Sequence, residues 1–206
     1  LFFGGSAKLA NTNDLSTDLS FAGLTFTSGA GAFVLGGSGI TLSGSLVNLD
    51  NDSQTVNLPM ALPATQTFNA SNGNLVANGV LSGTGGLSKT GYYALTLAGN
   101  NTYEGLTTIS TGTVVISHAN ALGTTTSGTT INTSRGAALD LRGGITLAET
   151  LTFTGANVNK SCLVNGSGTN TISSMIYSAG GRHVINGGTV LNITGGITNN
   201  PFFVVN

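Results

Sequence analysis

The chain has 206 residues, of which 39% are hydrophobic and only 6% are charged, and its formal net charge is −1. Because soluble domains usually contain about 25% charged residues, solubility here must come from hydroxyl and amide groups. The six scattered Lys and Arg residues form no basic stripe, which excludes an electrostatic site for nucleic acid or anionic lipid. Disorder requires low hydrophobicity and high net charge, so it is excluded as well.

Short β-strands are predicted along the whole chain. Apolar and polar residues alternate within them, which is typical of strands with one buried face. No window of about a dozen residues has the i, i+3, i+4, i+7 spacing of an amphipathic helix. The predicted strands, in chain order, are 24–26, 33–35, 40–42, 46–49, 55–58, 95–97, 107–109, 114–116, 138–141, 145–147, 151–153 and 189–193.

The spacing of these strands predicts the architecture. Their centres recur at short intervals, with Gly, Asn or Ser at the bends, and such short strands cannot hold a sandwich together. We therefore expect an all-β solenoid with about three strands per coil and eight or nine short coils. The 22 Asn residues against 2 Gln fit this fold, because Asn tolerates bends and can stack in ladders. Residues 1–206 are expected to form a single β-helix domain.

One stretch resembles a known family. Residues 83–123 contain GTGGLSKTG, LTLAG, NTY, TTI, GTV and ALG in this order. This pattern resembles the passenger-associated repeat of bacterial autotransporter proteins, although Tyr93, Ala94, Glu104 and Leu106 depart from the residues common there. The resemblance implies a right-handed parallel β-helix that is exported and displayed at the cell surface. It carries no catalytic residues to transfer to this chain.

Candidate sites for chemistry are few. Asp50 and Asp52 alternate, so they could form half of a calcium site or an acid pair, but a polar turn is the interpretation that we favour. Asp140 and Arg142, with Arg135 nearby, indicate a surface ion pair.

Two histidines and one cysteine complete the set of residues that we weigh. His118 and His183 are isolated from other metal-ligand types. The single cysteine, Cys162, has no partner for an intramolecular disulfide. We therefore predict no catalytic, cofactor-binding or metal-binding residues and no cofactor.

The tract Thr124–Thr130 has the composition of an ice-binding solenoid. Such proteins need Thr-x-Thr on one flat face of every coil. The tract occurs once in this sequence, so the sequence favours ice binding only weakly.

Both ends of the chain are apolar and aromatic, whereas a solenoid usually carries polar caps there. We therefore predict an assembly interface made of Leu1, Phe2, Phe3, Phe202, Phe203, Val204 and Val205. Two explanations stay open: the chain is a piece of a longer β-helix, or copies stack head to tail. The start at Leu1 rather than Met also fits a processed chain or a piece of a longer one.

The first functional hypothesis is a non-enzymatic, extracellular structural or adhesin-type β-helix of an exported bacterial surface protein. The alternatives are a self-assembling filament subunit and a β-helix that binds or cleaves polysaccharide. Expected partners are other copies end to end, host or matrix glycans, or surface proteins. No nucleic acid is expected as a partner. No apolar run approaches the length of about 18 residues that spans a bilayer, so we expect no membrane insertion of this segment.

Overall fold

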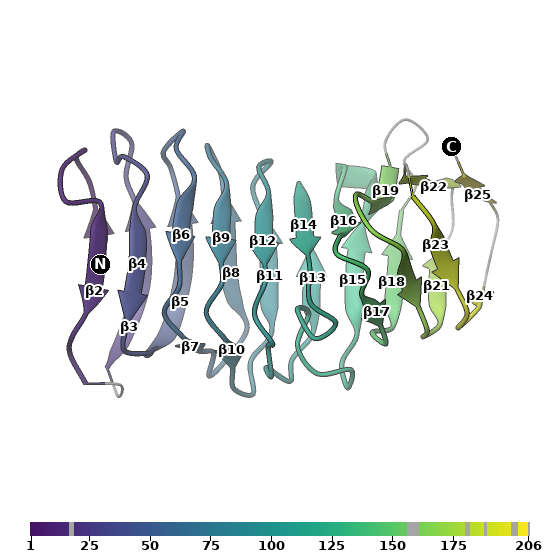
Figure 1. Cartoon of the computed structure of the whole chain (residues 1–206), viewed down its shortest axis with the longest axis horizontal. Helices are drawn as coiled ribbons and strands as arrows, with labels where there is room; N and C mark the ends of the chain where they lie inside the picture. The colour runs from purple at the N-terminus through teal and green to yellow at the C-terminus, as the bar shows by residue number, and fades with distance from the viewer. Residues whose placement is uncertain (17–18, 156–160, 180–181, 188, 199–201, 206) are drawn as a thin grey trace.

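A computed structural model describes residues 1–16, 19–155, 161–179, 182–187, 189–198 and 202–205, and for residues 179, 182–184 and 202–205 it describes the backbone alone. The chain winds as a parallel β-solenoid, and its coils follow one another along the long axis from the N-terminal to the C-terminal end (Figure 1). This architecture confirms the all-β solenoid predicted from the strand spacing.

Two long parallel sheets, here called sheets A and B, form the walls of the solenoid. The main path of sheet A runs through β1 (Phe2–Phe3), β3 (Ser20–Phe26), β5 (Ile40–Asn48), β8 (Gln66–Ala70), β11 (Leu87–Thr90), β13 (Thr107–Ile109), β15 (Thr129–Asn132), β18 (Leu151–Thr154), β21 (Ile176–Ala179) and β24 (Ile197–Thr198). Sheet B runs through β2 (Ala10–Asn13), β4 (Val34–Gly37), β6 (Gln54–Val56), β9 (Leu75–Ala77), β12 (Leu95–Leu97), β14 (Thr113–Ile116), β16 (Ala138–Leu141), β19 (Ser161–Asn165), β22 (Arg182–Gly187) and β25 (Phe202–Val205).

The third side of the solenoid is less regular than predicted. Its only sheet in the described part of the chain, sheet C, holds β17 (Thr146–Leu147), β20 (Asn170–Ile172) and β23 (Leu191–Ile193). Two further short strands, β7 (Met60–Ala61) and β10 (Leu81–Ser82), pair beside the main path of sheet A, and one 3₁₀ turn covers Thr133–Arg135. The predicted three strands per coil therefore occur only in some coils, because the third side elsewhere consists of bends.

The coils vary in length while most of their strands stay in register; the pairings of β3 with β5 and of β19 with β22 each contain one register shift. Leu95 pairs with Val114 in the next coil, and Val114 pairs with Leu139 in the coil after that, so the second of these coils is clearly the longer one. The bends take up this variation, so the strands still stack side by side. Ten described strands follow the path of each long sheet, which leaves nine intervals between them and agrees with the predicted eight or nine coils.

The core is built from columns of inward-facing residues. In β6, β9, β12, β13 and β20, which have three residues each, the first and third side chains are buried and the middle one is half-exposed, as in Leu95–Leu97. One column passes through Leu24, Leu46 and Phe68, which are paired in successive strands of sheet A and are almost fully buried. Since every inward position repeats once per coil, apolar triplets in the sequence become a continuous core.

Asparagine side chains join neighbouring coils at the bends, as predicted. Asn101 is 2% exposed. Its Oδ1 accepts a 2.8 Å hydrogen bond from the backbone N–H of Leu81, and its Nδ2 donates a 2.7 Å bond to the carbonyl of Ala121. These two bonds reach the coils before and after Asn101. One side chain therefore provides hydrogen-bond partners for two backbone groups that have none within the sheets.

We expect Asn101→Ala to lower the free energy of unfolding by about 1–3 kcal/mol, because it leaves a buried N–H and a buried carbonyl without partners. Urea unfolding of the purified chain measures this change. The matched control is Asn120→Ala, whose side chain makes only an exposed bond to Asn100 and should change stability by less than about 0.5 kcal/mol. Equal losses in the two variants would contradict the proposed bridge.

Candidate functional site

The carboxylates of Asp50 and Asp52 do not form an acid pair. Asp50 is 8% exposed, and its two oxygens accept hydrogen bonds from the backbone N–H groups of Gly29, at 2.7 Å, and Asp52, at 2.9 Å. Asn48 Oδ1 in turn accepts the N–H of Asp50. The structure therefore assigns Asp50 to a polar turn, the interpretation that the sequence favours.

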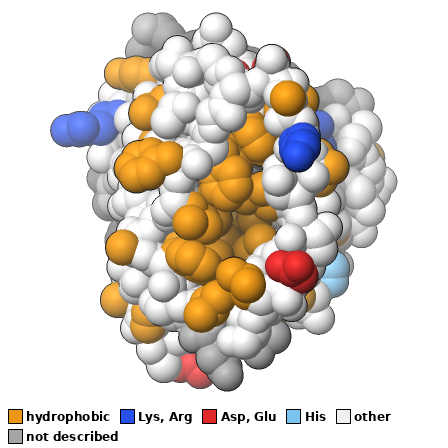
Figure 2. All heavy atoms as spheres, turned by 90° about the vertical axis from the view of Figure 1, so that its left-hand side faces the viewer, with side chains coloured by type: hydrophobic (Ala, Val, Ile, Leu, Met, Phe, Trp, Pro, Cys, Tyr) orange, Lys and Arg blue, Asp and Glu red, His pale blue; other side chains and the backbone are white. Residues whose placement is uncertain are grey.

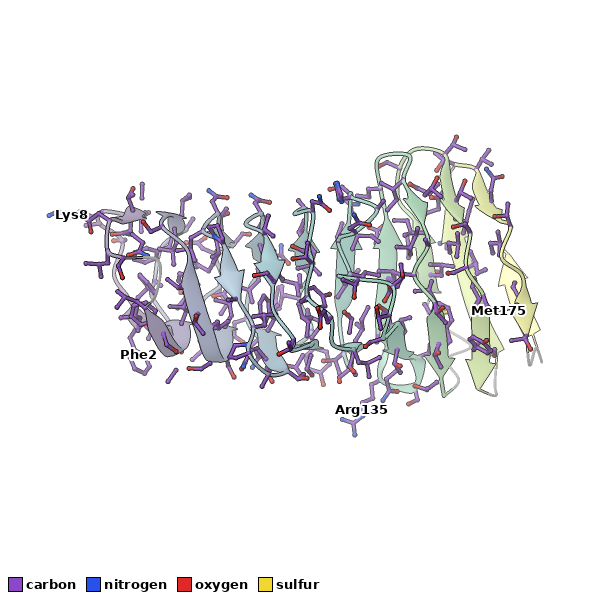
Figure 3. The ribbon with its side chains drawn as sticks, turned by 90° about the horizontal axis from the view of Figure 1, so that it is seen from below. Phe2, Lys8, Arg135 and Met175 are labelled. Carbon is purple, nitrogen blue, oxygen red and sulfur yellow. The ribbon has the colours of Figure 1, made fainter. Side chains whose placement is uncertain are left out.

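Asp140 and Arg142 form the predicted ion pair. Arg142 donates through Nε and Nη2 to Asp140 Oδ2, at 2.9 and 2.8 Å, and the second Asp140 oxygen accepts the N–H of Gly166. Arg135 takes no part and points away from the rod (Figure 3). Through Gly166, Asp140 thus also contacts the next coil. The Asp140 side chain is almost covered, so the pair forms no open site.

Only one of the two histidine side chains lies in the described part of the chain. His118 Nδ1 accepts the backbone N–H of Asn120 and closes a local turn. The side chain of His183 lies outside the described residues, although its backbone belongs to β22. Among the residues that the structure describes, no group of three or more His, Cys, Asp or Glu side chains could hold a metal ion.

Lys89 is the most unusual buried residue. It occupies an inward position of β11, between Phe68 and Ile109 in the neighbouring strands, and it is fully buried. Its ammonium donates to three backbone carbonyls, those of Thr90 and Gly91 at 2.8 Å and of Thr111 at 3.2 Å. Burial lowers the pKa of Lys89 to about 8. The side chain therefore joins two successive bends from inside the core.

The backbone around Lys89 is shaped to leave room for it. Gly112 has φ +69°, and a Cβ at this position would lie 2.9 Å from Lys89 Nζ. Only glycine adopts this conformation readily. The sequence shows Lys89 as an isolated lysine, and its inward direction follows only from the strand register.

Glu149 belongs to a second cluster of buried polar side chains. Its Oε1 accepts a 3.1 Å hydrogen bond from Thr129, while its buried Oε2 has no partner within the described part of the chain. On the same side of the core, the hydroxyls of Tyr103 and Thr107 lie 2.6 Å apart, and Thr107 stacks on Thr129 in the next strand. Burial raises the pKa of Glu149 to about 7, against the opposing effect of the Thr129 bond.

The N-terminal end of the rod exposes its core. Figure 2 shows hydrophobic side chains gathered around a hollow on this face. The hollow is a cavity of about 210 Å³ whose apolar lining includes Leu1, Phe3, Phe21, Leu24 and Ile40. Beneath it, Phe3 stacks on Phe26 with ring centroids 5.1 Å apart, and both contact Phe33. Phe2 is 81% exposed and lies at the same end (Figure 3).

The two predicted end segments lie at opposite ends of the rod. Phe2–Phe3 form β1, the first strand of sheet A, and Phe202–Val205 form β25, the last strand of sheet B (Figure 1). The side chains of Phe202, Phe203, Val204 and Val205 lie outside the described residues. The assembly interface assigned to both ends therefore stays a prediction.

The two buried ionisable groups predict a stability minimum near pH 7–8. Between pH 4.5 and 7 the folded chain holds a proton on Glu149 that the unfolded chain releases, so stability falls as pH rises. Between about pH 8 and the ordinary lysine pKa of 10.5 the unfolded chain holds the extra proton at Lys89, so stability rises. Above pH 10 the raised pKa of Tyr103 opposes this rise.

Thermal or urea unfolding between pH 5 and 10 checks this profile. Relative to the unsubstituted chain, Glu149→Gln should flatten the limb below pH 7, and Lys89→Met should flatten the limb between pH 8 and 10. Each variant serves as the control for the other, because each should leave the opposite limb intact. Unchanged limbs in both variants would show that these groups titrate alike in the folded and unfolded chains.

In the described part of the chain no helix is long and apolar enough to cross a bilayer. No protein-family model matches the chain, so the passenger-associated repeat at residues 83–123 stays a prediction. No solved structure matches it either.

One curated protein does show similarity. The chain is 31% identical over 153 residues to the "Adhesin BmaC autotransporter" of Brucella suis biovar 1 (strain 1330). The matched region is 74% of this chain but only 4% of the adhesin, so the chain spans a small part of its relative's length. The β-solenoid fold and this similarity together confirm the resemblance to autotransporter passengers that the sequence predicts.

Proposed function

We propose that the chain is a non-enzymatic, rod-like segment of an adhesin-type protein displayed outside the bacterial cell. The observation that carries this proposal is the similarity to an autotransporter adhesin over 74% of the chain. The solenoid supports it, since stacked coils give an extended rod that can hold binding surfaces away from a cell. Host or matrix glycans and surface proteins are the partners that we expect for the whole adhesin.

The engagement of the acidic groups supports a non-enzymatic role. Acid–base cleavage of a glycoside usually needs two accessible carboxyl groups about 5–10 Å apart. Asp50 is held by backbone N–H groups, Asp140 is paired with Arg142, and Glu149 is 2% exposed. These three carboxyl groups are therefore buried or paired and not open to a substrate, which argues against acid–base cleavage at these positions.

Surface display is tested with antibodies raised against the purified chain. We expect them to label intact, unpermeabilised cells of the source bacterium, and brief protease treatment of intact cells should remove the signal. A cytosolic protein probed in parallel is the control and should be detected only after permeabilisation. If the chain were likewise detected only after permeabilisation, the proposal of an exported adhesin would be wrong.

A second candidate function, end-to-end assembly of copies, is favoured by the apolar cavity at the N-terminal end. All described strands of sheets A and B are parallel, and each sheet ends in a terminal strand at both ends of the rod. A second copy moved along the axis would place β24 beside β1 and β25 beside β2 with the strand direction preserved. Such a head-to-tail contact does not close and gives a filament.

Assembly is tested by sedimentation and electron microscopy over a range of concentrations. We expect oligomers that lengthen with concentration, and Phe2→Asp should reduce them to monomers by placing a charge at the apolar contact. Tyr92→Asp is the matched control, because Tyr92 is 83% exposed on the flank of the rod and should not affect assembly. Short monomeric rods at every concentration would eliminate this candidate.

A further inference from the structure

The bend between β11 and β12 displays two adjacent aromatic side chains. Tyr92 is 83% exposed and Tyr93 is 47% exposed, and in the part of the chain that the structure describes neither hydroxyl has a hydrogen-bond partner. Tyr103, by contrast, is fully buried, and its hydroxyl lies 2.6 Å from that of Thr107. An aromatic side chain usually buries about 150–250 Å² in a core or an interface, so an exposed pair marks a candidate contact surface. We call residues 91–94 the tyrosine bend.

The preceding coil holds the tyrosine bend in place. The backbone N–H of Tyr93 donates to the carbonyl of Ala70 at 3.1 Å, and the N–H of Ala94 donates to Asn74 Oδ1 at 3.0 Å. Gly91 has φ +79°, and a Cβ at this position would lie 2.2 Å from the Ala70 carbonyl oxygen. Glycine is therefore required where the bend begins, and the backbone under the two rings has one fixed path.

Lys89 ties down the same bend from the core. Its buried ammonium donates to the carbonyl of Gly91 in this bend, at 2.8 Å, and to that of Thr111 in the next bend, at 3.2 Å. Burying a charge costs free energy, whereas an apolar side chain would fill this inward position without that cost. A buried charge and an exposed aromatic pair thus occur in one short stretch, 89–93. Such departures from the usual pattern concentrate at functional sites.

A bend that is held in this way is prepared for binding. Ordering a loop when a partner arrives costs free energy, and in the tyrosine bend the order is already present before any partner binds. A tyrosine side chain adds little further cost, because it has only two torsion angles to fix. Neither Tyr92 nor Tyr93 belongs to the core, so both can be substituted without removing core packing.

Small uncharged residues flank the tyrosine bend. The bends beside it, residues 71–74 and 110–112, consist of Ser, Asn, Gly and Thr. Asn72 donates through Nδ2 to the carbonyl of Leu49, and Asn74 accepts through Oδ1. Within the described residues, Asn72 Oδ1 and Asn74 Nδ2 have no partner, and both asparagines are exposed. An available acceptor and an available donor therefore lie in the bend next to the two rings.

These surroundings restrict the chemistry of a partner. A charged ligand would lose hydration without meeting an opposite charge, because the ammonium of Lys89 is buried and bound to carbonyls. A protein partner needs a contact of about 800 Å² on each side, and the small polar residues around the two rings offer no apolar surface of that extent. A sugar ring, in contrast, has a face of C–H groups that packs on an aromatic ring and hydroxyls that donate and accept hydrogen bonds.

We propose that the tyrosine bend binds neutral oligosaccharides. A sugar ring stacks on Tyr92 or Tyr93, and its hydroxyls bond to the amides of Asn72 and Asn74. This inference rests on the proposed adhesin function, for which glycans are among the expected partners. Two rings give one weak contact, so firm attachment requires many copies of the chain or a repeating polysaccharide.

The experiment is affinity electrophoresis of the purified chain through native gels that contain a soluble glucan, mannan or galactan, together with an array of neutral and sialylated oligosaccharides. We expect at least one neutral polysaccharide to retard the chain. The double variant Tyr92→Ser, Tyr93→Ser should bind at least tenfold more weakly. The matched control is Tyr177→Ser, which removes an exposed tyrosine from sheet A and should keep full retardation. Circular dichroism and the unfolding temperature establish that both variants are folded.

Three results would overturn the proposal. They are a chain that no neutral glycan binds, a folded double variant that is retarded like the unsubstituted chain, and binding confined to sialylated oligosaccharides. Surface labelling of intact cells is a separate measurement, so the two proposals can fail independently. A chain that is displayed on the cell and binds no saccharide would reject this site and leave the proposed adhesin function standing.

Discussion

The in-register stacking of parallel coils is the constraint on which the whole structure depends. An inward position of one coil lies directly above the same position of the next, so a column such as Leu24, Leu46 and Phe68 must stay apolar or be compensated at each step. Coil length is free to vary, because bends absorb the difference between one coil and the next. Asparagines such as Asn101 then pair the backbone groups that those bends leave over.

Lys89 and Glu149 are the places where this rule is broken and then compensated. The Lys89 ammonium finds three carbonyls at two successive bends, so a charge in the core acts as a clip between coils. Glu149 has one hydroxyl partner and an unpaired oxygen, an environment that favours the protonated acid. Their opposite charges do not meet, and each shifts in the direction that burial alone dictates. The two groups together therefore lower the free energy of unfolding most near pH 7–8, between their shifted pKa values.

Most of the fold could be predicted from sequence because short segments show by themselves which residues form strands and which form bends. Triplets such as Leu95–Leu97 show their buried and half-exposed sides directly, and the excess of Asn over Gln indicates bends. The third side could be predicted only in part: the predicted strands 145–147 and 189–193 overlap β17 and β23, whereas β20 has no predicted counterpart. Lys89 cannot be recognised as a core residue from sequence, because whether it points in or out depends on its register with Phe68 in the preceding coil and Ile109 in the following one.

Regular stacking also decides what kind of function this surface can support. A solenoid repeats each outward position once per coil, so its flanks present rows of similar groups, and unlike groups converge only where a bend or an end interrupts the repeat. The two buried aspartates lie apart and each has its own partner: Asp50 accepts backbone N–H groups at a bend, and Asp140 is paired with Arg142. What remains available is the tyrosine bend and the apolar end around Phe3. Both favour contact with an extended or repeating partner over turnover of a small molecule.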